Sequence, residues 1–158
     1  KKKKKADTDI NASSLTVKIT EALSVGHDVG TSDARDFAQT CTHTFASIAN
    51  VSKRVLKLEN TNLTEVATFS TGESVGTFKR ASVKYIRVTN LDGTDALQVG
   101  LDDEDSDAAY TEVAPASSIM YTGTKVEGGN GGSTLDNATA LKVKGVAGHT
   151  LEVFIASV

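Results

Sequence analysis

The chain has 158 residues, of which 39% are hydrophobic, and its formal net charge is −3. Together with 13 glycines, this is the composition of one globular domain, which excludes a disordered or a collagen-like chain. No apolar stretch reaches the roughly 18 residues of a transmembrane helix, and none follows the first lysines as it would in a secretory signal. We therefore expect neither a membrane span nor an intact secretory leader.

The charge is distributed unevenly along the chain. Lys1–Lys5 hold five of the 17 basic residues, and the rest of the chain carries 12 basic against 20 acidic side chains. Because an acidic body repels phosphate backbones, we expect no nucleic-acid partner. The lysines are either a basic arm that contacts an anionic partner or a segment foreign to the native chain. We predict a flexible polar and basic arm over residues 1–13 and a single domain over 14–158.

Cys41 is the only cysteine, so no internal disulfide can form and a disulfide-stapled secreted module is excluded. The three histidines do not have zinc-site spacing with it. Cys41 and His43 are two residues apart, so they share a face if their segment is a strand. Because no third group is at hand to activate the thiol, the pair predicts a buried thiol beside a core or interface imidazole.

Apolar and polar residues alternate with a period of two along most of the chain, which is typical of half-buried strands. Residues 15–20 alternate Leu, Val and Ile with Thr and Lys, and residues 40–45 alternate threonine with Cys, His and Phe. The only helical candidate is a turn at 32–39, which Ser32 would cap. Further strands are predicted at 51–58, 65–70, 83–91, 96–101, 109–113, 118–121, 141–146 and 151–158.

This spacing of short strands predicts an all-β fold, an antiparallel β-sandwich that is jelly-roll-like and has eight to ten strands. Asp92 and Gly93 form a tight-turn pair between two strongly strand-like segments, so we expect a hairpin there. The last segment, 151–158, is apolar on both faces in its second half, which indicates a central strand or an interface. Residues 14–158 show no internal boundary and are predicted to form the single β-sandwich domain.

An acidic stretch holds the one candidate metal site. Asp103, Asp105 and Asp107 match the first three ligand positions of an EF-hand loop. The match ends there, because alanine stands where the loop needs its glycine and again where it needs its bidentate glutamate (Ala108 and Ala114). We interpret the stretch as a solvated acidic turn between strands, with a calcium site on the three aspartates as the alternative. No other cofactor is expected.

Two segments resemble a known class of protein. Residues 83–101 read VKYIRVTNLDGTDALQVGL, and the chain ends on LKV at 141–143 and LEVFIA at 151–156. In this order the segments are similar to those of small β-rich virion proteins of tailed bacteriophages, over Ala49 to Val158. The resemblance implies a jelly-roll-like sandwich on the capsid or tail, present as a symmetric oligomer and without catalytic residues.

The function expected from this resemblance is that of a non-enzymatic virion structural protein. We expect a capsid decoration or cement protein that stabilises the phage particle through subunit contacts, or a related fibre-base protein. Its partners would be copies of itself, as a homotrimer, and capsid or tail proteins, with no membrane involved. Its location would be the virion, extracellular when mature. The alternative is a glycan- or calcium-binding β-sandwich module that acts in adhesion, with the three aspartates as calcium ligands.

Overall fold

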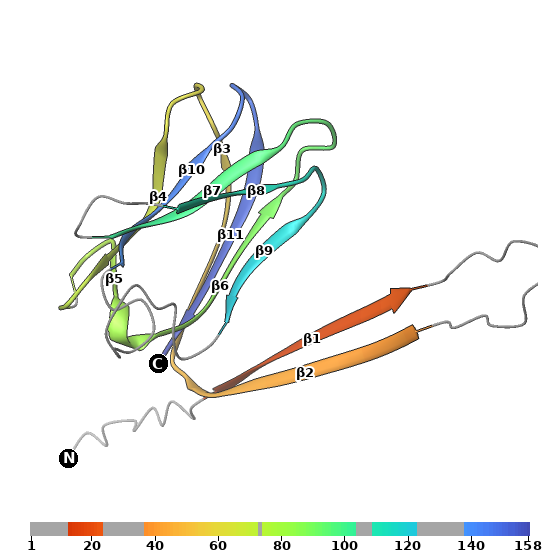
Figure 1. Ribbon diagram of the computed structural model, residues 1–158. Coiled ribbons are helices and arrows are strands. Elements are labelled where there is room, and N and C mark those ends of the chain that lie inside the picture. The colour runs from red at the N-terminus through yellow and green to blue at the C-terminus, as the bar shows by residue number, and fades with distance from the viewer. Residues whose placement is uncertain (1–12, 24–36, 73, 104–108, 123–137) are drawn as a thin grey trace, which may run out of the picture. The chain divides into compact units, whose positions relative to one another are not determined.

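A computed structural model describes residues 13–23, 37–72, 74–103, 109–122 and 138–158 (Figure 1). Within these ranges the chain forms eleven strands and one short 3-10 helix, η1 (Arg80–Ser82). None of the described residues belongs to a helix long and apolar enough to cross a membrane. The strands are β1 (Ser13–Leu23), β2 (Phe37–Ile48), β3 (Asn50–Lys57), β4 (Thr64–Ser70), β5 (Thr77–Lys79), β6 (Val83–Asn90), β7 (Leu97–Asp103), β8 (Ala109–Val113), β9 (Ser118–Thr122), β10 (Ala138–Lys144) and β11 (Thr150–Ser157).

The chain divides into two compact units, Lys1–Ile48 and Ala49–Val158. This boundary lies well beyond residue 13, where the sequence analysis places the end of the arm. The described part of the first unit is a two-stranded ribbon of β1 and β2, and the second unit contains all the other strands. The first two predicted strands therefore exist, but they form a sheet of their own.

In the ribbon, β1 and β2 pair antiparallel over their whole lengths, from Ser13 opposite Ile48 to Leu23 opposite Phe37. The predicted alternation at residues 15–20 is confirmed, because Leu15, Val17 and Ile19 are half-buried while the Thr and Lys residues between them are exposed. The helical turn predicted at 32–39 is wrong for residues 37–39, which belong to β2. Cross-strand pairing with β1, such as Gln39 with Glu21, overrides the local capping signal there. Residues 32–36 lie outside the described ranges.

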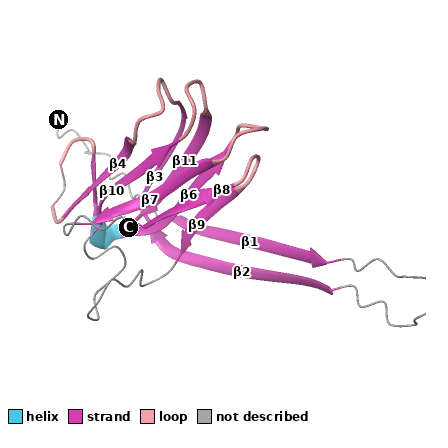
Figure 2. Cartoon of the chain, turned by 45° about the horizontal axis from the view of Figure 1, so that its top comes forward, coloured by secondary structure: helices cyan, strands magenta, loops and turns pink. Residues whose placement is uncertain are grey.

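The second unit is a β-sandwich of two sheets, with strand orders β5-β4-β10-β7-β8 and β3-β11-β6-β9 (Figure 2). The antiparallel pairs are nested: β3 pairs with β11, β4 with β10, β6 with β9 and β7 with β8. A hairpin folded back on itself and rolled into two sheets gives this nesting, which is the order of a jelly roll. The predicted fold class is confirmed. The short β5, parallel to β4, is an addition that the alternation did not predict.

The hairpin predicted around Asp92 and Gly93 is wrong. The strands on either side of this pair, β6 and β7, belong to different sheets, so residues 91–96 cross from one layer of the sandwich to the other. Asp92 closes a local turn, since its Oδ1 accepts bonds from the backbone N–H groups of Thr94 and Asp95, at 2.9 and 3.2 Å. The turn chemistry is thus as expected, but the strands that it joins do not pair with each other.

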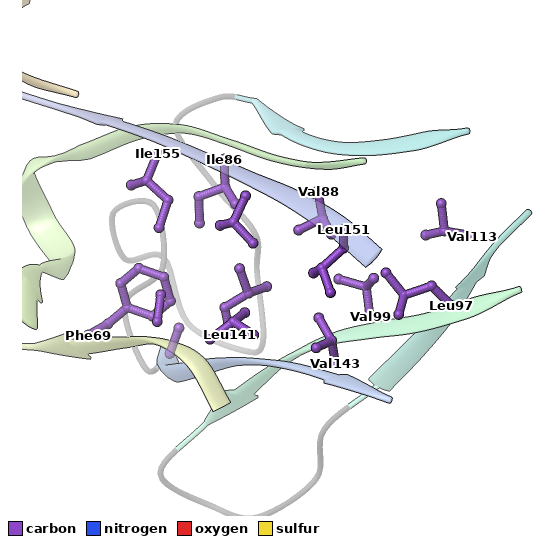
Figure 3. Packing of buried hydrophobic residues seen from close by; sticks show 14 of the residues in the cluster. Phe69, Ile86, Val88, Leu97, Val99, Val113, Leu141, Val143, Leu151 and Ile155 are labelled. Atoms are coloured by element: carbon purple, nitrogen blue, oxygen red, sulfur yellow. The ribbon is translucent and has the colours of Figure 1, made fainter. Parts of the chain in front are cut away.

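The core lies between the two sheets, and both contribute side chains that point toward one another (Figure 3). Strand β11 is central in its sheet, between β3 and β6, which confirms one of the two positions expected for the apolar last segment. Complete burial of a Leu or Ile side chain stabilises the fold by about 1.5–3 kcal/mol. The fully buried residues include Ile86, Val88, Leu97, Val99, Leu141, Val143, Leu151, Val153 and Ile155.

Candidate interaction surface

The outer face of the five-stranded sheet is polar and charged. Lys142 on β10 makes a charged hydrogen bond to the carboxylate of Asp102 on the neighbouring β7, and this bond raises the pKa of the lysine. Tyr110 on β8 donates from its hydroxyl to the same carboxylate at 3.4 Å. On β4, the Thr68 hydroxyl donates to Glu65 at 2.6 Å. Side chains of this kind are typical of a sheet face that is in contact with water.

The outer face of the four-stranded sheet is built differently. Strand register aligns one row of side chains across it, with Lys53 on β3 opposite Phe154 on β11, Phe154 opposite Arg87 on β6, and Arg87 opposite Met120 on β9. These residues alternate with the core residues of the same strands, so they point outward. We call this surface, with the flanking rows of Val51 and Val55, the cationic sheet face; its further members are Tyr85, Thr89, Ser118 and Glu152.

An ion triad organises the centre of the cationic sheet face. Glu152 accepts a bond from Arg87 Nη2 at 2.6 Å through one carboxylate oxygen and forms an ion pair with Lys53 Nζ at 3.0 Å through the other. The guanidinium carbon of Arg87 also lies 5.6 Å from the centre of the Phe154 ring, a cation–π distance. Tyr85 meets the same ring edge-on at 5.8 Å between centroids. Two cations are thus held in fixed positions by one carboxylate.

The environment of this carboxylate shifts its titration. Hydrogen bonds from Lys53 and Arg87 hold the pKa of Glu152 below its ordinary value of 4.5. The Glu152 side chain is only 14% exposed, whereas Lys53 and Arg87 are 60% and 35% exposed, so water still reaches both cations. Burial raises the pKa of Tyr85, against the opposing effect of the nearby Arg87 charge. The Glu152 carboxyl group is therefore ionised at neutral pH.

The Glu152 triad predicts a measurable acid sensitivity. A carboxylate with a lowered folded-state pKa contributes stability that is present above its unfolded pKa and is lost as the pH falls through the folded value. We expect Glu152→Gln to lose about 1 kcal/mol of stability at pH 7 and to differ less from the wild type as the pH drops from 5 to 3. Urea unfolding of both proteins at several pH values measures this difference. A gap that stays constant over this range would contradict the assignment.

Exposed apolar side chains surround the triad. Val51 and Val55 on β3 are 58% and 60% exposed, and Met120 on β9 is 36% exposed. With Lys53 and Arg87 against Glu152, the charged groups on these rows give a net charge of +1 on an otherwise acidic molecule. Of the residue types on this face, Arg, Met and the aromatic residues are the ones enriched at protein interfaces.

The predicted calcium ligands lie at the margin of the described structure. Asp103 is the last residue of β7, where its backbone is opposite Ala138. Asp105 and Asp107 lie outside the described ranges. Among the residues that the structure describes, no group of three His, Cys, Asp or Glu side chains is placed to hold a metal ion. The calcium site therefore stays a prediction.

Cys41 and His43 share a face of β2, as predicted, but they are exposed rather than buried. In the register they are opposite Ile19 and Val17 of β1. The His43 ring packs on Phe45 at 4.4 Å between centroids. The expectation of a core thiol is wrong, because a two-stranded ribbon has no second layer of its own to cover this face.

One buried polar pair was missed by the sequence analysis. Asn90 and His149 are both fully buried, and His149 Nε2 lies 2.7 Å from Asn90 Oδ1. The Asn90 amide nitrogen donates to the carbonyls of Asp95, Val113 and Ala114 at 2.8–3.2 Å. Its oxygen must then be the acceptor, so His149 Nε2 carries a proton. The hydrogen bonds of this pair link three of the connections between the two sheets at one end of the sandwich.

A small cleft opens where β3 faces the start of β4. Arg54, on the inner side of β3, reaches across it and donates from Nη2 to the backbone carbonyl of Val66 at 2.5 Å. The lining mixes Lys57 with Glu59 and Glu65, so neither sign of charge dominates. Arg54 therefore ties the two sheets together at this edge.

No protein-family model, curated protein or solved structure matches the chain. The described residues are distinguished by the nested strand order, by the contrast between the two outer sheet faces and by the two-stranded ribbon.

Proposed function

We propose that the chain is a non-enzymatic structural protein of a bacteriophage particle, a capsid decoration or cement protein that acts as a homotrimer. The observation that carries the proposal is the cationic sheet face, which keeps Val51, Val55 and Met120 exposed around a fixed ion triad. The jelly-roll order supports it at the level of fold, since capsid domains use this architecture. Lectin domains use it as well, so the surface decides more than the topology.

The cationic sheet face suits an acidic partner surface such as the outside of a capsid subunit. Burial of its apolar side chains contributes about 25 cal/mol per Å² removed from water. Glu152 already holds Lys53 and Arg87 in place, so docking costs these two long side chains little conformational entropy. A decoration protein that binds in this way stabilises the particle by burying apolar surface and by pairing opposite charges alone.

The first test of this function is the mass of the protein in solution, measured by light scattering behind a sizing column with and without calcium. We expect a trimer or larger ring whose mass does not depend on calcium. A monomer whose melting temperature rises with calcium would overturn the proposal. That result would favour the adhesion module with Asp103, Asp105 and Asp107 as ligands.

A second test addresses the cationic sheet face directly. Val55→Asp places a carboxylate beside Glu152, its register partner on β11, and we expect it to weaken binding to undecorated particles about tenfold or more. Gln98→Asp is the matched control, because Gln98 is exposed on β7 of the other sheet, next to Lys144. Co-sedimentation of each variant with particles gives the affinities. Equal binding by Val55→Asp and wild type, or an equal loss in Gln98→Asp, would rule out this face.

A further inference from the structure

We propose that the β1–β2 ribbon is the element through which copies of this chain associate with one another. The inference rests on the proposed function, which requires an oligomer, and names the part of the chain that builds it. The occupant of the ribbon's apolar face and open edges is the ribbon of a second copy.

The sandwich protects its own strand edges. At the edges of the five-stranded sheet lie β5 with three residues and β8 with five, and β9 with five lies at one edge of the other sheet. The one long edge strand, β3, carries the basic residues Lys53, Arg54 and Lys57. Short strands and edge lysines are the usual means by which proteins prevent pairing with foreign strands.

The ribbon lacks these protections. Strands β1 and β2 have 11 and 12 residues, and in the described structure each pairs only with the other, so each has one open edge. Neither strand contains proline or glycine, and Lys18 and Glu21 are their only charged residues. Long, β-prone and nearly uncharged edges are templates for pairing with another chain.

The two faces of the ribbon differ in polarity. One face is polar, and its threonine hydroxyls contact each other across the strands, Thr16 with Thr44 at 3.4 Å and Thr20 with Thr40 at 3.3 Å. The other face carries Leu15, Val17 and Ile19, which remain half-exposed, opposite Phe45, His43 and Cys41 respectively. Phe45 is buried, so the open part of this face is the part around His43 and Cys41. A two-stranded sheet is at best marginally stable in water until such a face is covered.

Charge favours a second copy as the occupant. Residues 49–158 hold 10 Lys and Arg against 14 Asp and Glu, so these units carry −4 each and repel one another. The strands of the ribbon carry one Lys and one Glu and are neutral. Copies can therefore meet ribbon to ribbon without like-charge repulsion, in the closed symmetric arrangement that is usual for homo-oligomers.

Paired substitutions on the two faces of the ribbon test this. Val17→Glu puts a charge on the apolar face, and Thr42→Glu puts the same charge on the threonine face, opposite Lys18. We expect Val17→Glu to reduce the solution mass to that of a monomer and Thr42→Glu to leave the oligomer unchanged. An oligomer that persists in Val17→Glu overturns the inference. In that case association uses another surface, and the proposed function still stands.

The single cysteine gives a second readout that requires no disruption of the ribbon. Cys41 lies on the apolar face, so a second copy that covers this face should slow the reaction of its thiol with a maleimide. The double variant Cys41→Ser/Thr42→Cys moves the thiol to the threonine face, where it should react at the rate of an exposed thiol. Equal reaction rates in the two oligomeric proteins overturn the inference. A wild-type monomer at all concentrations overturns the proposed function as well.

Discussion

Replacement of Asn90 by alanine is expected to lower the free energy of unfolding by about 3–5 kcal/mol. The Asn90 side chain is fully buried and forms hydrogen bonds with five groups at once. Its nitrogen donates to three backbone carbonyls, and its oxygen accepts from His149 Nε2 at 2.7 Å and from the backbone N–H of Asp92 at 3.0 Å. Alanine leaves these groups without their partner, most of them away from water, and each such group costs about 1–3 kcal/mol.

Urea unfolding of the wild type and Asn90→Ala measures this loss. The matched control is Asn60→Ala in the β3–β4 connection, where the Asn60 side chain accepts one bond from the Asn62 backbone N–H at 2.9 Å and is exposed. We expect the control to change stability by about 0.5 kcal/mol or less. Similar losses in the two variants would show that the Asn90 network does not depend on burial.

We expect a large loss of stability because Asn90 lies where several connections between the sheets come together. Around it, the backbone N–H groups of Leu58 and Leu91 donate to the carbonyls of His149 and Thr150, at 2.8 and 3.0 Å. Ala116 N–H donates to the Asp92 carbonyl at 2.9 Å. Four connections between the sheets thus meet at one end of the sandwich, and Asn90 with His149 fills the space between them.

Sequence patterns predicted the strands well because alternation is a local property. Leu15, Val17 and Ile19 can be assigned to one face from their spacing alone, and the structure agrees. Pairing is not local. Asp92 and Gly93 have good hairpin chemistry, yet β6 and β7 lie in different sheets, since β6 pairs with β9 and β11. The choice of partners depends on the burial of the whole sandwich, which no short segment encodes.

The contacts at the candidate surfaces also could not be predicted from local sequence. Alternation assigns Lys53 and Glu152 to outward positions on their own strands, but their ion pair requires β3 and β11 to be neighbours, which follows from the nested strand order. Asn90 and His149 are 59 residues apart in the sequence. An asparagine at the end of one strand and a histidine after Gly148 carry no local sign that they will meet. Buried polar pairs of this kind become visible only once the fold is known.

Gly145→Ala is expected to destabilise the protein by about 2–3 kcal/mol through a clash with the same histidine. A Cβ at position 145 would lie 2.9 Å from His149 Nδ1 and 3.1 Å from its Cγ, both closer than van der Waals contact. The imidazole cannot turn aside without breaking its bond to Asn90. Gly93→Ala is the control, because a Cβ there meets no atom within 4 Å, and we expect it to change stability by less than about 0.5 kcal/mol.

A double-mutant cycle separates the clash from any effect on the backbone. Gly145 does not have the positive φ that disfavours alanine, unlike Gly148 at +90°. The cost of alanine at 145 should therefore be steric and should disappear when the ring is removed. In a His149→Ala background we expect Gly145→Ala to cost about 0.5 kcal/mol or less, a coupling of about 2 kcal/mol between the two positions. An equal cost in both backgrounds would place the strain elsewhere, against Leu58 Cδ1, the other atom within 3.1 Å of the added carbon. The cycle thus tests whether glycine is needed at 145 because the imidazole that holds Asn90 fills the space above it.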